Sequence, residues 1–261
     1  MCVMQTRIII AQFSYFFKFF SEFPVMQKRK SLDLGQSLRY NKNNEILMRW
    51  RMRHILLFMD SNPVLDGERI VMRKLTKADA QDMYSYSSRY EVTKYLLWHP
   101  HESLSYTKRY LDEVMRQYKA HNFFDFAVVS KENGRMIGTC GFTRLDTLNH
   151  SAEIGYVLSP DYWGRGMASE AVSMILRFAF CNLGLHRVEA RYMPMNLASQ
   201  RVMEKSGMLF EGVEREGIYV KGSYQDVGTC AILRDEYLAR HNNLPFRWKE
   251  QSTRSPFAFF S

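Results

Sequence analysis

Two glycines and an alanine, in the pattern Gly164-x-Gly166-x-Ala168, follow a short apolar segment and open a strongly helical one. Glycine lets the backbone come close to a ligand, and the first N–H groups of a helix have no partner inside the helix. The helix dipole favours negative charge at the same point. The pattern therefore predicts a backbone cradle for a diphosphate group.

A dinucleotide-binding fold uses a similar glycine pattern. It places the glycines after the first strand of repeating strand–helix–strand units, with an acidic residue about twenty residues further on. Here three strand-like segments come before the glycines, and short turns join them, including Lys131-Glu-Asn-Gly134, whose Asn-Gly pair suits a tight hairpin. The three segments, residues 124–129, 135–142 and 153–158, predict an antiparallel meander and argue against a dinucleotide fold.

The remaining periodicity predicts an α+β fold. The helix after the meander must cross over to a parallel neighbour, so we expect a mixed, largely antiparallel sheet of about six to seven strands flanked by helices. Thr76 followed by Asp79 resembles a helix start. The other expected elements are strands over residues 69–75, 187–193, 213–220 and 224–233, and helices over residues 79–87, 106–118, 169–183 and 196–206.

The net charge of +9 on 261 residues is concentrated at the ends of the chain. Residues 1–60 contain ten Lys/Arg against four Asp/Glu, whereas residues 61–240 contain 23 against 22. A nucleic-acid-binding face would need this charge in the folded part, so we do not expect nucleic acid as the main partner. We expect residues 1–61 to be a poorly ordered basic and aromatic extension, residues 62–240 to form the domain, and residues 241–261 to be a C-terminal extension. An alternative for the first segment is weak binding to a membrane or a partner.

Cysteine and histidine spacing predicts neither a disulfide framework nor a metal site. His99 and His101 share a predicted loop, but no third ligand is spaced to join them. No apolar run approaches the ~18–20 residues of a membrane-spanning helix, so we expect no integral membrane segment. Reduced, buried cysteines in a cytoplasmic protein are the expectation for Cys2, Cys140, Cys181 and Cys230, which form no Cys-x-x-Cys.

Taken together, these segments resemble the GNAT superfamily of acetyl-CoA-dependent N-acetyltransferases, and within it the RimJ/RimL-like branch, over residues 62–238. Residues 152–158 (Ala-Glu-Ile-Gly-Tyr-Val-Leu) resemble the central splayed strand, and residues 162–171 (Tyr-Trp-Gly-Arg-Gly-Met-Ala-Ser-Glu-Ala) resemble the pyrophosphate loop. Residues 196–208 resemble the Asn-x-x-Ser…Glu-Lys-x-Gly-Phe helix, with Met208 in place of the usual Phe. The resemblance implies a V-shaped splay between the strand at residues 153–158 and the strand at residues 187–193.

The resemblance also implies acetyl-CoA as co-substrate and no metal. In the family, loop N–H groups hold the diphosphate, the splayed strand binds the pantetheine and polarises the thioester carbonyl, and a helix asparagine fixes the cofactor arm. Carried over by position, the cofactor-binding residues are Tyr156, Val157, Leu158, Gly164, Arg165, Gly166, Met167, Ala168, Ser169 and Asn196.

Two groups are needed for direct attack of an amine on the thioester in a ternary complex. Glu153 matches the strand glutamate that serves as general base in histone-modifying members, and the alternative is a structural carboxylate paired with an arginine. Glu216 is a second candidate base. Many relatives place a proton-donating tyrosine seven residues after the helix asparagine, where this chain has Met203. Ser199 matches the serine of RimL-like members, and its alternative role is a hydrogen bond to its own helix.

The expected reaction is acetylation of a protein N-terminal α-amine, of the ribosomal-protein type. Acetylation of a small amine (a polyamine, an antibiotic or an amino acid) is the alternative, since specificity depends on residues 84–105, which carry no diagnostic motif. A non-catalytic acetyl-CoA-binding module is the third hypothesis. Cys140 and Cys181 are expected in the core and not as nucleophiles, because no histidine is positioned beside them. The protein is expected to be a monomer or a homodimer.

Overall fold

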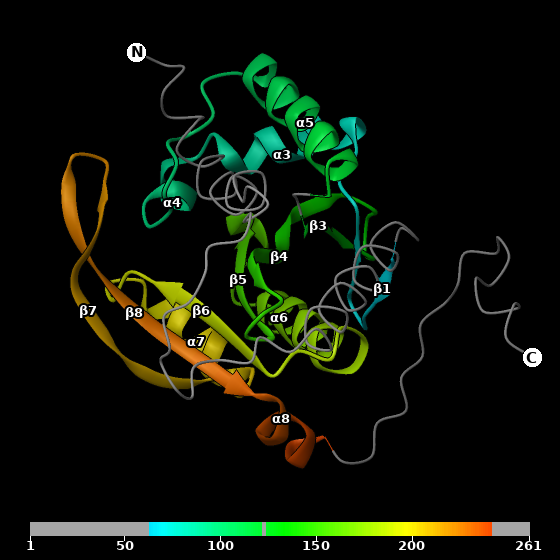
Figure 1. Cartoon of the computed structure of the whole chain (residues 1–261). Coiled ribbons are helices and arrows are strands. Elements are labelled where there is room, and N and C mark those ends of the chain that lie inside the picture. The colour runs from blue at the N-terminus through cyan, green and yellow to red at the C-terminus, as the bar shows by residue number, and fades with distance from the viewer. Residues whose placement is uncertain (1–62, 122–123, 242–261) are drawn as a thin grey trace, which may run out of the picture. The chain divides into compact units, whose positions relative to one another are not determined.

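A computed structural model describes residues 63–121 and 124–241 of the chain. These residues form a mixed sheet of eight strands in the order β1-β2-β3-β4-β5-β6-β8-β7 (Figure 1). Neighbouring strands are antiparallel except for β5 and β6, which are parallel. The strands are β1 (Leu65–Asp66), β2 (Ile70–Arg73), β3 (Phe124–Ser130), β4 (Met136–Asp146), β5 (Ser151–Leu158), β6 (Arg187–Tyr192), β7 (Leu209–Val220) and β8 (Ser223–Leu233).

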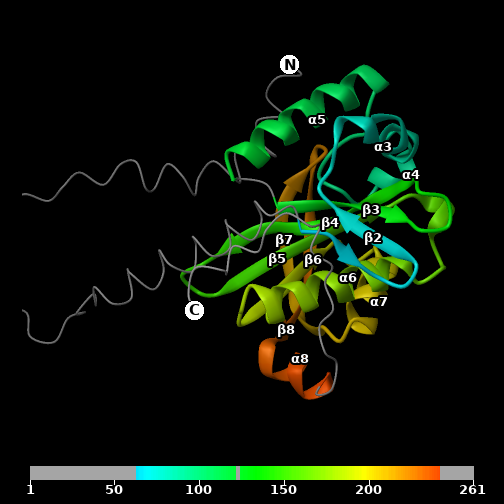
Figure 2. The same ribbon diagram turned by 90° about the vertical axis from the view of Figure 1, so that its right-hand side faces the viewer.

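Helices lie on both sides of the sheet (Figure 2). α3 (Ala80–Ser87) and α5 (Leu104–Lys119) pack on one face, and α6 (Met167–Arg177) and α7 (Leu197–Lys205) pack on the other. Alternate residues of β3 serve the two faces: Phe126 and Val128 belong to the core under α6, and Ala127 belongs to the core under α3 and α5. The shorter helical elements are η1 (Lys77–Asp79), α4 (Tyr90–Thr93), η2 (Pro160–Tyr162), η3 (Phe178–Asn182) and α8 (Arg234–Arg240).

Side-chain caps explain where several helices begin. The predicted start at Thr76 is a capping box, in which the Asp79 carboxylate accepts a hydrogen bond from the Thr76 N–H at 2.7 Å, and η1 leads directly into α3. Ser103 accepts from the N–H of Tyr106 at 3.1 Å and begins α5. Asn196 begins α7 in the same way. These caps fix the helices relative to the strands that precede them.

β5 and β6 pair over only part of their length. β5 pairs with β4 up to Leu158, but its parallel pairing with β6 ends where Ile154 lies opposite Ala190. From Gly155 onward, the edge of β5 that faces β6 has no strand partner among the described residues. The expected splay between these two strands is therefore confirmed.

The expected α+β class and the order of the elements are confirmed, with differences at the edges. The eighth strand is β1, whose two residues are too few to produce an alternating pattern. α8 follows β8 directly, at a place where no helix was expected. Cys140 and Cys230 are buried, but Cys181 is exposed, which corrects its assignment to the core. The reason is that η3 buries Phe178, Ala179 and Phe180 and turns the next side chain outward.

The expected extensions at residues 1–61 and 241–261 lie outside the described residues except for His241, so those expectations and the proposed domain boundaries stay predictions. Within residues 63–121 and 124–241, no helix is long and apolar enough to cross a membrane.

The aromatic core beneath α6 gives a stability test. Phe178 is fully buried, and its ring centroid lies 5.9 Å from that of Phe126 and 6.1 Å from that of Phe142. Phe178→Ala leaves a cavity and is expected to lower the free energy of unfolding by about 3–5 kcal/mol in a denaturant titration. The matched control is Phe210→Ala on edge strand β7, where half of the side chain is exposed and we expect a loss of about 1 kcal/mol or less. Equal losses in the two variants would contradict this core assignment.

Candidate functional site

The glycine-rich loop adopts the backbone conformation that the sequence predicts. Gly164 and Gly166 have φ angles of 73° and 77°, in the left-handed region that favours glycine, and α6 begins immediately afterwards at Met167. No side chain of the described residues caps this helix. The N–H groups of its first turn are therefore free to bind an anion.

Arg69, which the sequence gave no reason to select, holds this loop in place. Its backbone N–H and its Nε each donate to the carboxylate of Glu170, both at 2.8 Å, and its Nη1 donates to the Arg165 carbonyl at 2.7 Å. A Cβ atom on Gly166 would lie 3.2 Å from Nη1, so the guanidinium group covers this glycine closely. No short-range pattern relates residues 69 and 170, because the contact exists only once β2 lies beside α6.

The unpaired edge of β5 runs toward the loop. It contains the three residues predicted to bind the pantetheine, Tyr156, Val157 and Leu158. The indole Nε1 of Trp163 donates to the Leu158 carbonyl at 2.8 Å, so that carbonyl already has a partner in the protein. The edge is thus closed at its end by Trp163 and available before it.

A hydrogen-bonded pair connects β5 with α7 across this site. The Tyr156 hydroxyl donates to the Ser199 carbonyl at 2.9 Å, and its oxygen lies 2.8 Å from Ser199 Oγ. Because the tyrosine has one proton, the serine hydroxyl donates to Tyr156 in this arrangement. Burial raises the pKa of Tyr156, which keeps the phenol protonated. The sequence predicted Ser199 as a proton donor but assigned Tyr156 only a backbone role.

Two further residues, Asn196 at the start of α7 and Met203 within it, bear on the roles of this pair. Asn196 Oδ1 accepts from the Ser199 N–H at 3.2 Å, and its Nδ2 has no partner among the described residues, so it is free to donate to a ligand. Met203, at the position where many relatives have tyrosine, is 1% exposed and belongs to the core. The Met203 side chain is thus part of the core beneath α6 and α7, and its thioether has no proton to donate.

Glu153 belongs to a charge ladder on the opposite face of the sheet, formed by Arg144, Glu153, Arg187, Glu189 and Glu211. Its carboxylate accepts from the Thr143 hydroxyl at 3.2 Å and lies 3.9 Å from Arg144 Nε. Arg144 also pairs with Glu189 at 2.5 Å. One carboxylate oxygen of Glu153 thus has a hydrogen-bond donor, and the other lies only at the limit of an ion pair with Arg144, which agrees with the structural alternative for this residue.

Glu216 lies apart from the other candidates. It sits in a bulge of β7, has a φ angle of 52°, and its N–H donates to Asp226 at 2.8 Å. Its side chain is exposed. The described interactions of Glu216 include no contact with Glu153 or Ser199, so the structure groups Ser199 with Tyr156 and leaves the two predicted bases separate.

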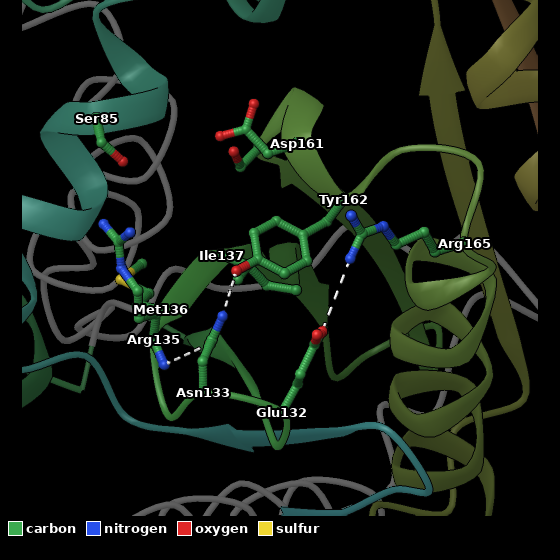
Figure 3. A pocket seen from close by; sticks show the side chains of 10 residues that line it. Ser85, Glu132, Asn133, Arg135, Met136, Ile137, Asp161, Tyr162 and Arg165 are labelled. Carbon is green, nitrogen blue, oxygen red and sulfur yellow. Dashed lines mark hydrogen bonds and ion pairs between the residues drawn. The ribbon is translucent and has the colours of Figure 1, made fainter.

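A polar pocket of about 250 Å³ adjoins the loop on the side of the β3–β4 turn (Figure 3). Asn133 donates to the Tyr162 hydroxyl at 2.8 Å, and Arg165 lies 3.7 Å from Glu132 and over the ring of Tyr162. These contacts brace the outer side of the loop. The pocket is not where we expect acetyl transfer, because it contains neither the unpaired edge of β5 nor any of the predicted acid–base residues.

The environments of His101 and Cys140 are those of residues that stabilise the fold. His101 accepts or donates at Nδ1 to Thr107 at 2.8 Å and packs against Trp98, and burial lowers its pKa to about 4. Burial raises the pKa of the Cys140 thiol well above its usual range. Within residues 63–121 and 124–241, no group of three or more His, Cys, Asp or Glu side chains could hold a metal ion.

Comparison with known proteins identifies the family. Residues 69–209 match the family described as "Acetyltransferase (GNAT) domain". The chain belongs to the GNAT acetyltransferases. It is similar to the "Uncharacterized N-acetyltransferase p20" of Bacillus licheniformis, with 35% identity over 173 residues that cover 65% of this chain and 96% of p20. The chain is thus an acetyl-CoA-dependent N-acetyltransferase, as the sequence resemblance implied.

Two further relatives differ in their acceptors. The "Putative ribosomal N-acetyltransferase YdaF" of Bacillus subtilis is 28% identical over 66% of this chain and 94% of YdaF. The spermidine N(1)-acetyltransferase of Vibrio cholerae is 25% identical over 67% of this chain and 98% of its own length. A solved GNAT acetyltransferase from Bacillus anthracis has a TM-score of 0.60 and 30% identity, covering 66% of this chain and 99% of the other.

Substituting the loop glycine tests the diphosphate cradle. Gly166→Ala puts a Cβ against Arg69 and strains a left-handed residue, so the loop must move and we expect CoA binding to weaken at least ~10-fold. Gly134→Ala is the matched control: its φ of 71° imposes similar strain, but it lies in the β3–β4 turn with no atom within 4 Å of the new Cβ. Isothermal titration with CoA measures both, and equal affinities for the two variants would contradict the cradle.

Proposed function

We propose that this acetyltransferase transfers the acetyl group of acetyl-CoA to a protein N-terminal α-amine of the ribosomal-protein type, by direct attack in a ternary complex. The observation that carries the proposal is the meeting of three features at the splay: the unpaired edge of β5, the uncapped start of α6 and the Tyr156–Ser199 pair. The β5 edge would bind the pantetheine arm, the start of α6 would bind the diphosphate, and the Tyr156–Ser199 pair would donate the proton.

The cofactor would lie along this edge. The N–H groups of Arg165 to Ser169 would hold the diphosphate, and the backbone of Tyr156 would pair with a pantetheine amide as an added strand does. Val157 pairs with Thr139 of β4, and its backbone groups face that strand, which corrects its assignment to the cofactor. A β5 N–H aimed at the thioester carbonyl would stabilise the oxyanion of the tetrahedral intermediate. Asn196 Nδ2, which has no partner among the described residues, would donate to the cofactor arm.

The bonds change in a fixed order. The amine lone pair forms the C–N bond at the thioester carbonyl, the C–S bond breaks, and the sulfur takes a proton as the thiol leaves. Ser199 would supply this proton by turning its hydroxyl from Tyr156 to the sulfur. It would then recover a proton from the Tyr156 hydroxyl, 2.8 Å away, once that hydroxyl turns from the Ser199 carbonyl to Ser199 Oγ, and Tyr156 regains its own proton from solvent. The attacking nitrogen must also lose a proton to a base.

The acceptor is the finer part of the proposal. The similarity to YdaF and the solved ribosomal-protein-S5-alanine acetyltransferase of Vibrio fischeri, 25% identical with a TM-score of 0.55, supports a protein N-terminus. The similarity to spermidine acetyltransferases supports a small amine instead. The predicted specificity region, residues 84–105, includes α4. At the C-terminal end of α4, the Thr93 carbonyl accepts a hydrogen bond at 2.5 Å from Lys221 Nζ, which lies at the tip of the β7–β8 hairpin. This contact joins the two elements that would border the acceptor.

Thiol release from acetyl-CoA tests the acceptor class. We expect peptides with a free N-terminal alanine or serine to give kcat/KM at least ~10-fold above spermidine, free amino acids and N-acetylated copies of the same peptides. The N-acetylated copies control for acetylation of lysine side chains. Preference for spermidine would transfer the proposal to small amines. Micromolar CoA binding without turnover on any amine would identify a binding module.

The proton donor has its own test. Ser199→Ala is expected to lower kcat by ~10²-fold, while the fold is retained because Tyr156 still donates to the backbone carbonyl of residue 199. Tyr156→Phe should lower kcat in the wild-type background but add little to Ser199→Ala, since the tyrosine acts through the serine. The control is Ser206→Ala, whose hydroxyl donates to the Val202 carbonyl near the other end of α7. Equal kcat for Ser199→Ala and Ser206→Ala would remove the serine from the mechanism.

A further inference from the structure

A third carboxylate, Asp125 on β3, lies on the sheet face covered by α3 and α5. Its neighbour Phe126 points to the opposite core, and Ala127 shares its face. Asp125 Oδ1 accepts from the Phe126 N–H at 3.0 Å. No basic side chain of the described residues forms an ion pair with Asp125. Neither the family resemblance nor the proposed mechanism uses it.

Two glycines bring this carboxylate toward the splay. Asp125 lies opposite Gly141 of β4, and Gly141 lies opposite Gly155 of β5, the first residue beyond the pairing with β6. A Cβ on Gly141 would lie 2.7 Å from Asp125 Oδ1, so the carboxylate leans over the glycine. Adjacent strands are about 5 Å apart, so Oδ1 lies roughly one strand spacing from the start of the open edge. The Thr143 methyl group borders this approach, 2.7 Å from where a Cβ on Gly155 would lie.

Three phenols face Asp125 from the helices, those of Tyr86 on α3 and of Tyr110 and Tyr118 on α5, and burial raises the pKa of all three. The Cys140 thiol of β4 lies near it as well, and the Lys74 ammonium group lies over the Tyr118 ring, 5.3 Å from its centroid. The Tyr118 hydroxyl donates to the backbone carbonyl of Asp125 at 2.6 Å and not to its carboxylate.

Burial also raises the pKa of Asp125, to about 7, against the opposing effect of hydrogen bonds from Thr139 and the Phe126 N–H. A carboxyl group with such a pKa exchanges protons readily at neutral pH. Glu153 differs in that Thr143 donates to one of its oxygens and the Arg144 guanidinium lies 3.9 Å from the other, so its charged form has a cationic neighbour. The geometry and the partners of the two residues therefore favour different roles.

We propose that Asp125 is the general base that takes the proton from the acceptor amine, directly or through one water. The N–H bond of the attacking nitrogen breaks, an O–H bond forms on the carboxylate, and the proton leaves to solvent before the next turnover. This inference rests on the proposed acetyl transfer at the same splay. It makes Glu153 a structural member of the charge ladder.

Three matched amide variants distinguish the candidate bases. With the best acceptor of the wild-type enzyme, Asp125→Asn is expected to lower kcat by ~10²-fold without a change in the affinity for CoA, and to remove the rise of kcat/KM near pH 7. Glu153→Gln and Glu216→Gln should retain kcat within about threefold. Wild-type kcat in Asp125→Asn, or a larger loss in Glu153→Gln, would overturn the inference. A wild-type enzyme that acetylates no amine would instead overturn the proposed function.

The pH dependence of protein stability tests the protonation of Asp125 independently of enzyme activity. In the unfolded chain an aspartate has a pKa of about 3.9. Between that pH and about 7 the folded state holds the proton and the unfolded state does not, so Asp125 costs the wild type stability as pH rises through this window. Asp125→Asn has no such titration, so its melting temperature should rise relative to wild type between pH 5 and pH 8. A difference that stays constant over this range would show that Asp125 titrates normally and cannot serve as proposed.

Discussion

From Gly155 to Leu158, one edge of β5 offers backbone N–H and C=O groups to which β6 no longer binds. An unpaired strand edge is a template for another extended chain, and a buried backbone group without a partner costs about 1–3 kcal/mol. The edge is only a few residues long, and Trp163 occupies its last carbonyl. It is therefore too short to pair with a full strand but long enough for an arm with two amide groups. The separation of β5 from β6 therefore provides a binding surface of unpaired backbone groups.

Two long-range contacts fix the helices at either side of this edge. Arg69 reaches α6 through Glu170, 101 residues away, and Tyr156 reaches α7 through Ser199, 43 residues away. Neither pair can form before β2, β5 and the helices have come together. The site therefore forms only when the sheet has folded. Packing on the sheet orients the starts of α6 and α7, which are then free to bind an anion and a cofactor arm. The two hydrophobic cores pack on opposite faces of the sheet and hold these helices in place on it.

The sequence was sufficient for features that depend on local chemistry. The glycine pattern, the Thr76 capping box and the Asn-Gly turn each express backbone requirements within a few residues, and each has the expected conformation. The order of strands and helices also followed from periodicity. Arg69 and the Tyr156 hydroxyl could not be found in this way, because their partners are distant in the chain. Cys181 was wrongly expected in the core, because the lack of a histidine partner does not determine burial, and η3 turns this side chain outward.

Three carboxylates illustrate why a motif and an environment can point to different residues. Glu153 is selected by its position in the splayed strand, yet Arg144 and Thr143 engage its oxygens. Glu216 is exposed on a bulge, where water solvates its charge. Asp125 has no motif, but β3 brings it into the same row of the sheet as Gly155, among tyrosines that stay uncharged. A base must hold a proton only briefly, so it needs a site where the charged form is neither paired nor well solvated. Of the three, Asp125 alone has that environment, and Gly141 and Gly155 continue its row toward β5, with the Thr143 methyl group over Gly155.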